Sequence, residues 1–476
     1  MNKIERKLNK WLAPVKEDLS PLYLVGGAVR DHLLDRESKD MDIACVKPEE
    51  TASLIGQYHN ASVVLFNKKQ NAVCYRVIDR NNKDDFLDIV QLRNNAISED
   101  LQERDFTFNS IAIQMNRKGQ IKKMIDPLNG IEDLQNRRIR ISSLHAFQSD
   151  PLRILRAFRF SAELNFDLET MTKQLLHEQF SLISSISIER IMAEIFKIFA
   201  TDQATQHIRH MDKIGLLEIL FPEIQKMKGC SQNDYHHLDV WDHSMLVLEN
   251  CEQILSNLNH YFPESADRIQ NILNMNNRLV LMKMAALFHD IGKPETRKTD
   301  KNSNNITFHN HDRAGQEIIS SMAKRIKLSG QDQIFLESMV DNHMHILFLS
   351  RPDVTEKTVL KWLRKSGDNF IPLVIIEMAD CKSTLGPASS KAFLDHHLNW
   401  SKGIINNYFD EIRQKIEKVS IINGNDLIAL GMSPGPRLGR ILSAIREAQD
   451  LGTIQNYKQG VALAKRIMKN HHHSFL

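Results

Sequence analysis

Two glycines and two aspartates near the start of the chain have a spacing that indicates chemistry. A short apolar run, residues 22–25, ends at Gly26-Gly27 and leads into a predicted helix. A glycine turn that opens a helix offers free backbone N–H groups and the positive end of a helix dipole, which suits phosphate. Asp40 and Asp42 follow in a predicted strand, where residues two apart lie on one face. Two such carboxylates repel unless a cation lies between them, and Mg²⁺ bridged by substrate phosphates prefers oxygen ligands. The pattern predicts a two-metal phosphoryl-transfer site.

These residues resemble the head of the class II nucleotidyltransferases, the family of the bacterial and eukaryotic CCA-adding enzymes and the bacterial poly(A) polymerases. The matching motifs occur in family order over residues 20–225, and they are Gly26-Gly27-Ala28-Val29-Arg30-Asp31, Asp40-Met41-Asp42, Arg104-Asp105-Phe106-Thr107-Phe108-Asn109, Asp126-Pro127, Asp150-Pro151-Leu152-Arg153 and Glu189-Arg190-Ile191. The resemblance implies an α+β protein. It would have a polymerase-β-like head with a mixed sheet, followed by an all-α neck.

The resemblance also implies roles for single residues. Asp40 and Asp42 are expected to be catalytic and to bind Mg²⁺. Asp88, in the apolar run 86–90, is expected to be the third catalytic carboxylate, which helps to deprotonate the attacking 3′-hydroxyl. The expected nucleotide-binding residues are Gly26, Gly27, Arg30, Asp31, Arg104, Asp105, Asn109, Asp150, Arg153, Arg156 and Arg159.

Base selection is predicted for the helix that begins at Asp150, because Asp150, Arg153 and Arg156 fall within one 120° arc. A carboxylate that accepts from an amino group, beside a guanidinium that donates to a ring nitrogen, would select C and A over U and G. In the family an acid precedes this aspartate, whereas Ser149 stands there in this chain. Asp150 is also a suitable N-cap before Pro151.

A second constellation lies further along the chain. His289-Asp290, with His243 upstream and Asp380 downstream, resembles the HD-type metal phosphohydrolases. The resemblance makes these four residues ligands of a divalent ion, Mn²⁺, Ni²⁺ or Mg²⁺, and His311 and His343 lie where binuclear members have further ligands. The alternative is a scaffold that has kept the motif without hydrolysis.

The amino-acid composition is typical of a mostly helical intracellular protein. The chain has 476 residues, 42% of them hydrophobic, and its 19 glycines and 13 prolines are few for that length, which favours helix. Neither a signal peptide nor a membrane span is predicted. The five cysteines lack metal-ligand spacing, so we expect reduced thiols in the cytoplasm. Basic residues outnumber acidic ones over residues 117–159, which favours binding of nucleic acid or triphosphate.

Changes in hydrophobic period predict the domains. Short apolar runs at 62–66, 72–78, 86–90 and 108–115 predict strands, and the pattern after residue 127 is helical, apart from a hairpin around 298–308. The predicted division is a head at 1–142, a neck at 143–226, an HD domain at 227–385 and a helical C-terminal region at 386–476.

The expected function is template-independent addition of C and A to the 3′ end of tRNA, from CTP and ATP, with no membrane and no obligate protein partner. CC-only addition, A-only addition and poly(A) synthesis remain alternatives. The short connection between Asp88 and Arg104 and the serine at 149 favour addition of only C or only A over addition of the full CCA sequence. A different class, an HD phosphohydrolase with an RNA-binding head, is disfavoured by the intact Asp40 and Asp42.

Overall fold

A computed structural model describes residues 3–15, 19, 21–38, 40–67, 73–116 and 120–470. The chain divides into two compact units, residues 1–220 and 221–476. Each unit has its own core, and each carries one of the two predicted constellations.

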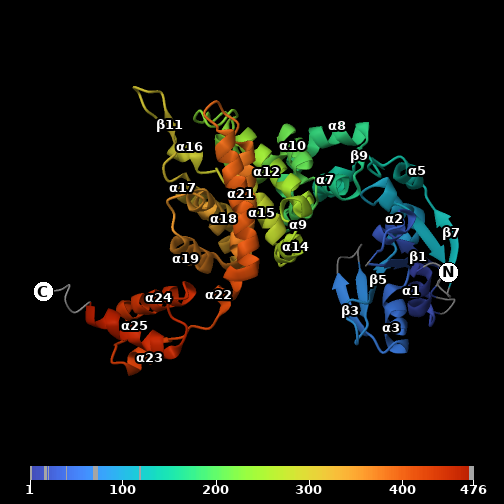
Figure 1. Cartoon of the computed structure of the whole chain (residues 1–476). Helices are drawn as coiled ribbons and strands as arrows, with labels where there is room; N and C mark the ends of the chain where they lie inside the picture. The colour runs from blue at the N-terminus through green and yellow to red at the C-terminus, as the bar shows by residue number, and fades with distance from the viewer. Residues whose placement is uncertain are drawn as a thin grey trace. The chain divides into compact units, whose positions relative to one another are not determined.

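The first unit contains a seven-stranded mixed sheet with the order β3-β4-β5-β2-β1-β6-β7 (Figure 1). Its strands are β1 (Leu22–Val25), β2 (Asp42–Cys45), β3 (Ser62–Asn67), β4 (Cys74–Ile78), β5 (Phe86–Gln91), β6 (Ala112–Met115) and β7 (Ile121–Ile125). Strands β2 and β5 are parallel, and the other neighbours are antiparallel. The parallel register sets Asp42 directly opposite Asp88, so the sheet brings the two predicted carboxylates together.

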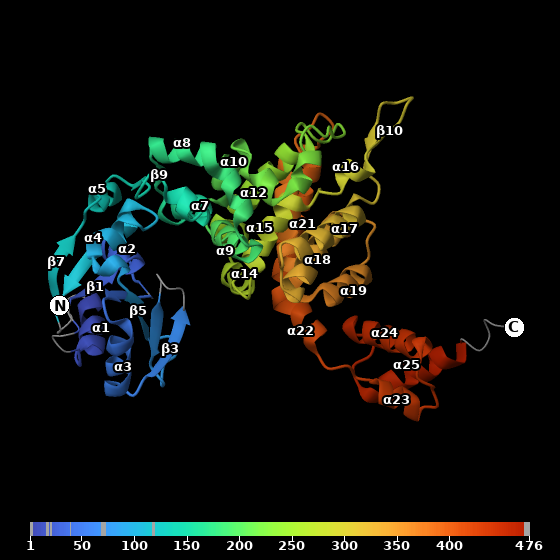
Figure 2. The ribbon, with the colours of Figure 1, turned by 180° about the vertical axis from the view of Figure 1, so that it is seen from behind.

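Helices flank and follow this sheet. The helix α3 packs against β3, β4 and β5 (Figure 2). The helices of the unit are α1 (Lys3–Leu12), α2 (Gly27–Leu33), α3 (Pro48–Tyr58), α4 (Ile97–Gln102), α5 (Gly130–Gln135), α6 (Ala146–Ser149), α7 (Leu152–Leu164), α8 (Thr170–Gln179), α9 (Ile188–Phe199), α10 (Ala204–Lys213) and α11 (Leu216–Leu220). The buried residues of α9 recur at helical spacing from Ile191 to Phe199, and this face packs against α7.

Two details differ from the sequence-based prediction. Residues 107–109 form a 3₁₀ turn, and the strand predicted at 108–115 begins only at Ala112. The reason is local, because the Asp105 carboxylate accepts from the Phe106 N–H and from the Asn109 amide, and such bonds compete with a ladder. After residue 127, the two-residue strands β8 (Arg138–Ile139) and β9 (Asp167–Leu168) interrupt the helical pattern.

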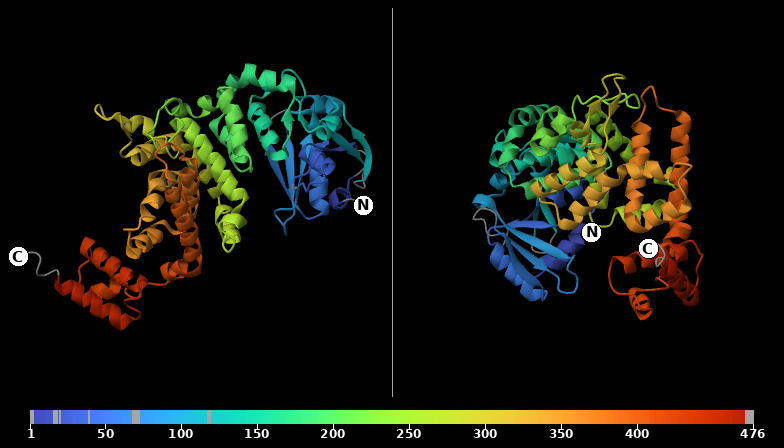
Figure 3. Two further views of the ribbon diagram at one scale, coloured as in Figure 1. Left: turned by 45° about the horizontal axis from the view of Figure 1, so that its top comes forward. Right: turned by 90° about the vertical axis from the view of Figure 1, so that its left-hand side faces the viewer.

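The second unit is helical apart from the hairpin of β10 (Lys298–Thr299) and β11 (Ile306–Thr307), which confirms the hairpin predicted around 298–308. Its longer helices pack around α15 and α20, and α21 lies beside α20 (Figure 3). The helices are α12 (Val240–Ser256), α13 (Leu258–Tyr261), α14 (Ala266–Leu273), α15 (Arg278–Phe288), α16 (Lys293–Thr296), α17 (His311–Arg325), α18 (Gly330–Leu349), α19 (Glu356–Ser366), α20 (Phe370–Ser383), α21 (Lys391–Asn407), α22 (Arg413–Glu417), α23 (Gly424–Ala429), α24 (Pro436–Asp450) and α25 (Tyr457–Asn470). A separate apolar cluster joins α23, α24 and α25. Over the described ranges, no helix is both long enough and apolar enough to cross a bilayer.

Candidate functional site

The Gly26-Gly27 turn lies where β1 ends and α2 begins, as predicted from the sequence. Gly26 has a φ of 73°, a left-handed conformation that favours glycine. A Cβ at this position would lie 3.3 Å from both Arg104 Nη1 and Asp42 Oδ2. The backbone of the turn therefore lies against a guanidinium and a predicted metal ligand, where a phosphate would meet all three.

Asp40 and Asp42 occupy different settings. Asp42 is the first residue of β2 and half-buried, whereas Asp40 precedes the strand and is exposed. Burial, and next the charge of Asp88, raise the pKa of Asp42 to about 6, and Asp40 adds to this rise. Negative groups that destabilise one another in this way provide the donor set that a divalent cation would stabilise.

Asp88 is held by a residue that the sequence analysis missed. Arg76 of β4 donates to both Asp88 oxygens, at 2.8 and 2.7 Å, and its guanidinium lies over the Phe66 and Phe86 rings. The sequence could have predicted this pair, because a hairpin that pairs Ile78 with Phe86 must set Arg76 opposite Asp88.

Five predicted nucleotide-binding residues are joined in one hydrogen-bonded chain. Arg30 pairs with Asp31 at 2.7 Å and donates to Asn109 Oδ1 at 3.3 Å. Asn109 donates to Asp105 Oδ1 at 3.0 Å, and Arg156 Nε donates to Asp105 Oδ2 at 2.9 Å. Burial alone would raise the pKa of Asp105, but Arg156 holds it below the usual value. The head motif and the neck helix α7 thus meet at a buried, ionised Asp105.

Arg104 lies between the Gly26 turn and the helix α4. Its guanidinium is bound by Asp100 of α4, at 2.9 and 3.1 Å, and Nη1 lies beside Gly26. Asp100 was not predicted from the sequence. The connection that carries it, residues 91–103, folds into a 3₁₀ turn and α4.

The predicted base-selecting residues have separate partners in the described structure. Asp150 pairs with Arg190 of α9 at 3.2 Å and also accepts from the Leu152 N–H at 3.3 Å, which is the capping role. Arg153 donates to the Glu103 carbonyl at 2.6 Å and to Ser149 Oγ at 3.2 Å. Ser149 therefore holds the guanidinium from the position where the family has an acid.

Arg159, the last predicted neck residue, pairs with Glu194 of α9 at 2.8 Å. Its guanidinium also lies 4.0 Å from the centre of the Phe160 ring, and Arg30 and Arg156 lie 5.2 and 5.3 Å from the same ring. Phe160 thus gathers three cations from the head and the neck around one aromatic ring. Phe160 ends the sequence motif that begins at Asp150, but the sequence did not predict this role for it.

The second constellation assembles in the other unit from four helices and one turn. His243 lies in the first turn of α12, whose N-cap Asp239 accepts from the Asp242 N–H at 2.8 Å. The other residues are His289 and Asp290 in the turn after α15, His311 at the start of α17, His343 on α18 and Asp380 on α20. A Cβ on Gly292 would lie 2.1 Å from the His311 carbonyl oxygen, so only glycine lets α17 approach the His289-Asp290 turn.

The tautomers of three histidines follow from their backbone contacts. The Nδ1 atoms of His289, His311 and His343 lie 2.9, 2.8 and 2.6 Å from carbonyl oxygens, which can only accept. Each ring therefore donates from Nδ1, and in its neutral form it presents an Nε2 lone pair. The Nε2 atoms of His311 and His343 are 3.1 Å apart. Two lone pairs at this separation repel unless a cation lies between them, so this donor set fits a metal ion.

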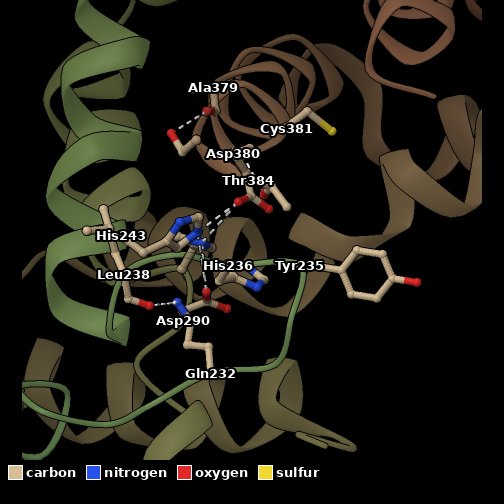
Figure 4. Close-up of polar contacts among 12 residues, drawn as sticks. Gln232, Tyr235, His236, Leu238, His243, Asp290, Ala379, Asp380, Cys381 and Thr384 are labelled. Atoms are coloured by element: carbon tan, nitrogen blue, oxygen red, sulfur yellow. Dashed lines mark hydrogen bonds and ion pairs between the residues drawn. The ribbon is translucent and has the colours of Figure 1, made fainter. Parts of the chain in front are cut away.

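Asp290 belongs to one of two neighbouring groups of ligand atoms and lies beside the other. One contains His243, His289 and Asp380, with His243 Nε2 2.9 Å from Asp380 Oδ1 and His289 Nε2 3.1 Å from Asp290 Oδ2. The other contains Asp290, His311 and His343, with separations of 3.4 and 3.7 Å. Figure 4 shows His243, Asp290 and Asp380 turned toward one another. The side chains of His243, Asp290 and His343 are about 1% exposed.

Two further residues adjoin this cluster. Lys293 Nζ lies 2.6 Å from Asp290 Oδ2 and donates to Gln232 at 2.8 Å. Burial alone would raise the pKa of Asp290, but His289 and Lys293 hold it well below the usual value. His236, in the turn before α12, groups with His243 and Asp290. A cavity of about 700 Å³ opens beside them and is lined by charged, polar and aromatic side chains, including Asp290, Lys293, His311, Asp380, Phe308 and Phe393.

Comparisons with protein families identify three segments. Residues 22–140 match "Poly A polymerase head domain", residues 165–228 match "Probable RNA and SrmB- binding site of polymerase A", and residues 240–365 match "HD domain". The first contains the glycine turn and the three carboxylates of the head, and the third contains the histidines and Asp290 of the second constellation, whereas Asp380 lies beyond it.

Curated relatives match most of the chain. An A-adding tRNA nucleotidyltransferase of Deinococcus radiodurans is 29% identical, with coverage of 93% of this chain and 94% of the relative. A CC-adding tRNA nucleotidyltransferase of Thermus thermophilus is 26% identical, with coverage of 91% and 90%. A multifunctional CCA protein of Actinobacillus pleuropneumoniae is 30% identical, with coverage of 77% and 86%.

Solved structures share the fold. The Thermotoga maritima CCA-adding enzyme complexed with tRNA matches with a TM-score of 0.64 and 19% identity, with coverage of 99% of this chain and 96% of that one. A CCA-adding enzyme in complex with ATP matches with a TM-score of 0.67 and 19% identity, with coverage of 98% and 96%. With the 30% identity to the multifunctional CCA protein, these findings show that the chain belongs to the family of tRNA nucleotidyltransferases and poly(A) polymerases of the CCA-adding type, with an HD domain.

Proposed function

We propose that this protein adds C and A nucleotides, from CTP and ATP, to the 3′ end of tRNA. The proposal depends on a match that covers 86–94% of the length of three relatives. They are named as an A-adding tRNA nucleotidyltransferase, a CC-adding tRNA nucleotidyltransferase and a multifunctional CCA protein. Solved structures of the same fold include complexes with tRNA, ATP and CTP. We also propose a cytoplasmic location, because tRNA, CTP and ATP are all available there.

The head supplies the chemistry in this proposal. Asp40 and Asp42 would hold Mg²⁺, which stabilises negative charge on the transferred phosphate when it is bound. The Gly26-Gly27 backbone and Arg104 orient the triphosphate. Asp88, held by Arg76, accepts the proton of the attacking 3′-hydroxyl, whose oxygen forms the new bond to the α-phosphorus as pyrophosphate leaves.

The start of α7 selects the base. Asp150 accepts from the amino group of C or A, and Arg153 donates to the neighbouring ring nitrogen. Arg190 orients the carboxylate, whereas Ser149 and the Glu103 carbonyl orient the guanidinium. Arg156 and Arg159 face the triphosphate or the RNA once substrate replaces their present partners.

Addition of only A, or of only CC, is a second candidate. The relatives matched over more than nine tenths of this chain are an A-adding and a CC-adding enzyme, whereas the multifunctional CCA protein matches 77% of it. The test uses tRNA transcripts that end at the discriminator base, at C and at CC, each with a single labelled nucleotide triphosphate. CCA addition extends all three, A addition extends only the CC end, and CC addition leaves the CC end unchanged.

That assay also tests the wider proposal. Long A tails on RNA that is not tRNA would replace it with poly(A) synthesis. Asp40→Ala and Asp42→Ala should abolish addition while tRNA still binds. Incorporation near the wild-type rate in either variant would contradict the assignment of these carboxylates.

We infer a second activity, metal-dependent hydrolysis of a phosphoester, for the histidine and aspartate cluster. The support for this activity is that the Nε2 atoms of His311 and His343 face each other at 3.1 Å, because a divalent ion bound by both would remove their repulsion. The proposed ions are Mn²⁺, Ni²⁺ or Mg²⁺. Purified protein should hydrolyse a 2′,3′-cyclic phosphate only with such an ion, and no hydrolysis with any of the three would leave this domain as a scaffold.

For the domains, we propose the division into 1–142, 143–226, 227–385 and 386–476. Its support is the positions of the three matched segments and the change of compact unit after residue 220. Limited proteolysis with N-terminal sequencing of the fragments tests these boundaries.

A further inference from the structure

A group of three potential ligands lies apart from both constellations. It comprises Glu377 and Cys381, one turn apart on α20, and His397 on α21. One ligand atom from each lies within 4.8 Å of the others. Glu377 and His397 are 1% and 0% exposed, so the group lies in the interior between two packed helices.

The protonation of His397 follows from its neighbour. The Ser350 hydroxyl donates to the Leu347 carbonyl at 2.9 Å, so its oxygen is left as the acceptor for His397 Nδ1 at 3.0 Å. His397 therefore carries its proton on Nδ1 and presents the Nε2 lone pair. This arrangement, in which one ring nitrogen is fixed by an outer partner, is the usual one for a metal-binding histidine.

The lone pair of His397 Nε2 faces a carboxylate oxygen. Nε2 lies 3.7 Å from Glu377 Oε1, too far for a hydrogen bond, whereas the Cys381 thiol donates to the same oxygen at 3.6 Å. Neither His397 Nε2 nor Glu377 Oε2 has a hydrogen-bond partner, although both atoms are buried. Burial of an acceptor that has no donor costs free energy, and a cation bound by these atoms would lower that cost.

The two separations that involve Glu377 Oε1 are close to those of metal ligands. Tetrahedral Zn²⁺ with bonds of about 2.3 Å to sulfur and about 2.0 Å to nitrogen or oxygen holds its ligand atoms roughly 3.3–3.5 Å apart. The observed 3.6 and 3.7 Å require only a small contraction. Glu377 and Cys381 also line the 700 Å³ cavity, from which water can supply a fourth ligand.

We propose that Glu377, Cys381 and His397 bind a thiophilic divalent ion of the Zn²⁺ class. A thiolate with an imidazole favours Zn²⁺ over Mg²⁺ or Mn²⁺, which prefer oxygen. The site differs in chemistry from the neighbouring histidine and aspartate cluster, which contains no sulfur, and Figure 4 shows the Cys381 sulfur directed away from His243. The ion ties α20 to α21 immediately beside Asp380.

Cobalt spectroscopy of the full-length protein tests this proposal. Metal-free protein is titrated with Co²⁺, and the sulfur-to-cobalt charge-transfer band in the near ultraviolet is recorded. Only a thiolate ligand produces this band, so the histidine and aspartate cluster does not contribute to it. We expect the band to saturate once Co²⁺ has filled this site and the competing histidine and aspartate cluster, and we expect Zn²⁺ to displace it.

Variants assign the signal. Cys381→Ser and His397→Asn should lose the band, whereas His289→Ala, which removes a ligand of the other cluster, should keep it. Cys251→Ser is the matched control, because Cys251 is a buried cysteine of the same unit outside the site. A folded wild-type protein without the band, or a band that persists in Cys381→Ser, would overturn the proposal whether or not the variants fold. Neither readout depends on nucleotide addition or hydrolysis.

Discussion

At the scale of single residues, the nucleotidyl-transfer site consists of charges that neutralise one another before substrate binds. Asp88 is held by Arg76, and Asp105 by Arg156. Asp42 is the exception, because its neighbours include carboxylates that raise its pKa to about 6. A bound cation would therefore stabilise the ionised form of Asp42 more than that of Asp88 or Asp105, which already have a guanidinium partner.

Replacement of Asp42 by Asn should stabilise the metal-free protein at neutral pH. Because the folded state raises the pKa of Asp42 above its ordinary value, the contribution of this proton to stability is complete below about pH 4 and lost as the pH rises through about 6. The loss is roughly 3 kcal/mol at most. In EDTA, the melting temperatures of Asp42→Asn and wild type should converge toward pH 4 and differ at pH 7.5 in favour of the variant.

Base choice is the second prediction at this scale. Arg153→Ala should relax discrimination against UTP and GTP more than it slows addition of CTP, because the lost donor distinguishes a ring nitrogen from an N–H. A paired contact of this kind contributes about 1–3 kcal/mol of discrimination. The measurement is kcat/KM for each of the four nucleotides. Equal losses for all four would identify Arg153 as a phosphate contact and Asp150 as an N-cap only.

At the scale of elements, the ends of helices bring the ligands together. His243 lies in the first turn of α12, His311 begins α17, and the His289-Asp290 turn ends α15. The approach of α17 to that turn depends on Gly292, because the Gly315 backbone and the His311 carbonyl oxygen occupy the space of a side chain.

Gly292→Ala should therefore damage the metal cluster without removing a ligand. Its Cβ would lie 2.1 Å from the His311 carbonyl oxygen, so α17 must move, at a cost typical of overpacking, about 1–3 kcal/mol. We expect lower bound metal and slower phosphoester hydrolysis with unchanged nucleotide addition. Gly330→Ala is the control, because no atom lies within 4 Å of its added Cβ. Wild-type metal content in Gly292→Ala would contradict this role of the close approach.

At the scale of the whole molecule, the two constellations belong to different compact units. The head carboxylates and the residues predicted to select the base lie within residues 1–220, and the histidine and aspartate cluster lies within 221–476. Neither cluster takes a ligand from the other unit among the contacts described above. The two activities should therefore be separable by mutation.

Paired variants test this separation. His289→Ala should lose hydrolysis of a 2′,3′-cyclic phosphate and retain CTP and ATP incorporation, and Asp42→Ala should show the reverse. The double variant should lose both activities, with losses that multiply, because distant sites contribute independently. Loss of nucleotide addition in His289→Ala, with melting behaviour unchanged, would instead reveal coupling between the units.

The sequence by itself determined the features that depend on local spacing. The glycine turn, the strands around Asp42 and Asp88 and the hairpin at 298–308 follow from apolar period and turn residues, because neighbouring residues alone dictate them. Motif order also predicted which family the chain belongs to. The roles of the individual site residues remain predictions, although the structure sets Asp42 opposite Asp88 and links Arg30 to Arg156 through Asn109 and Asp105.

Only the tertiary structure decided the partners of these residues. Arg190 of α9 reaches Asp150 across 40 positions of sequence, and Ser350 and Glu377 approach His397 from different helices. No local pattern encodes such pairs, since they depend on which helix faces pack against one another. The cysteines lack metal-ligand spacing in the chain, yet Cys381 lies beside His397 because α20 and α21 pack side by side. Long-range packing therefore created the thiolate site, and short-range spacing marked the two carboxylates of the head.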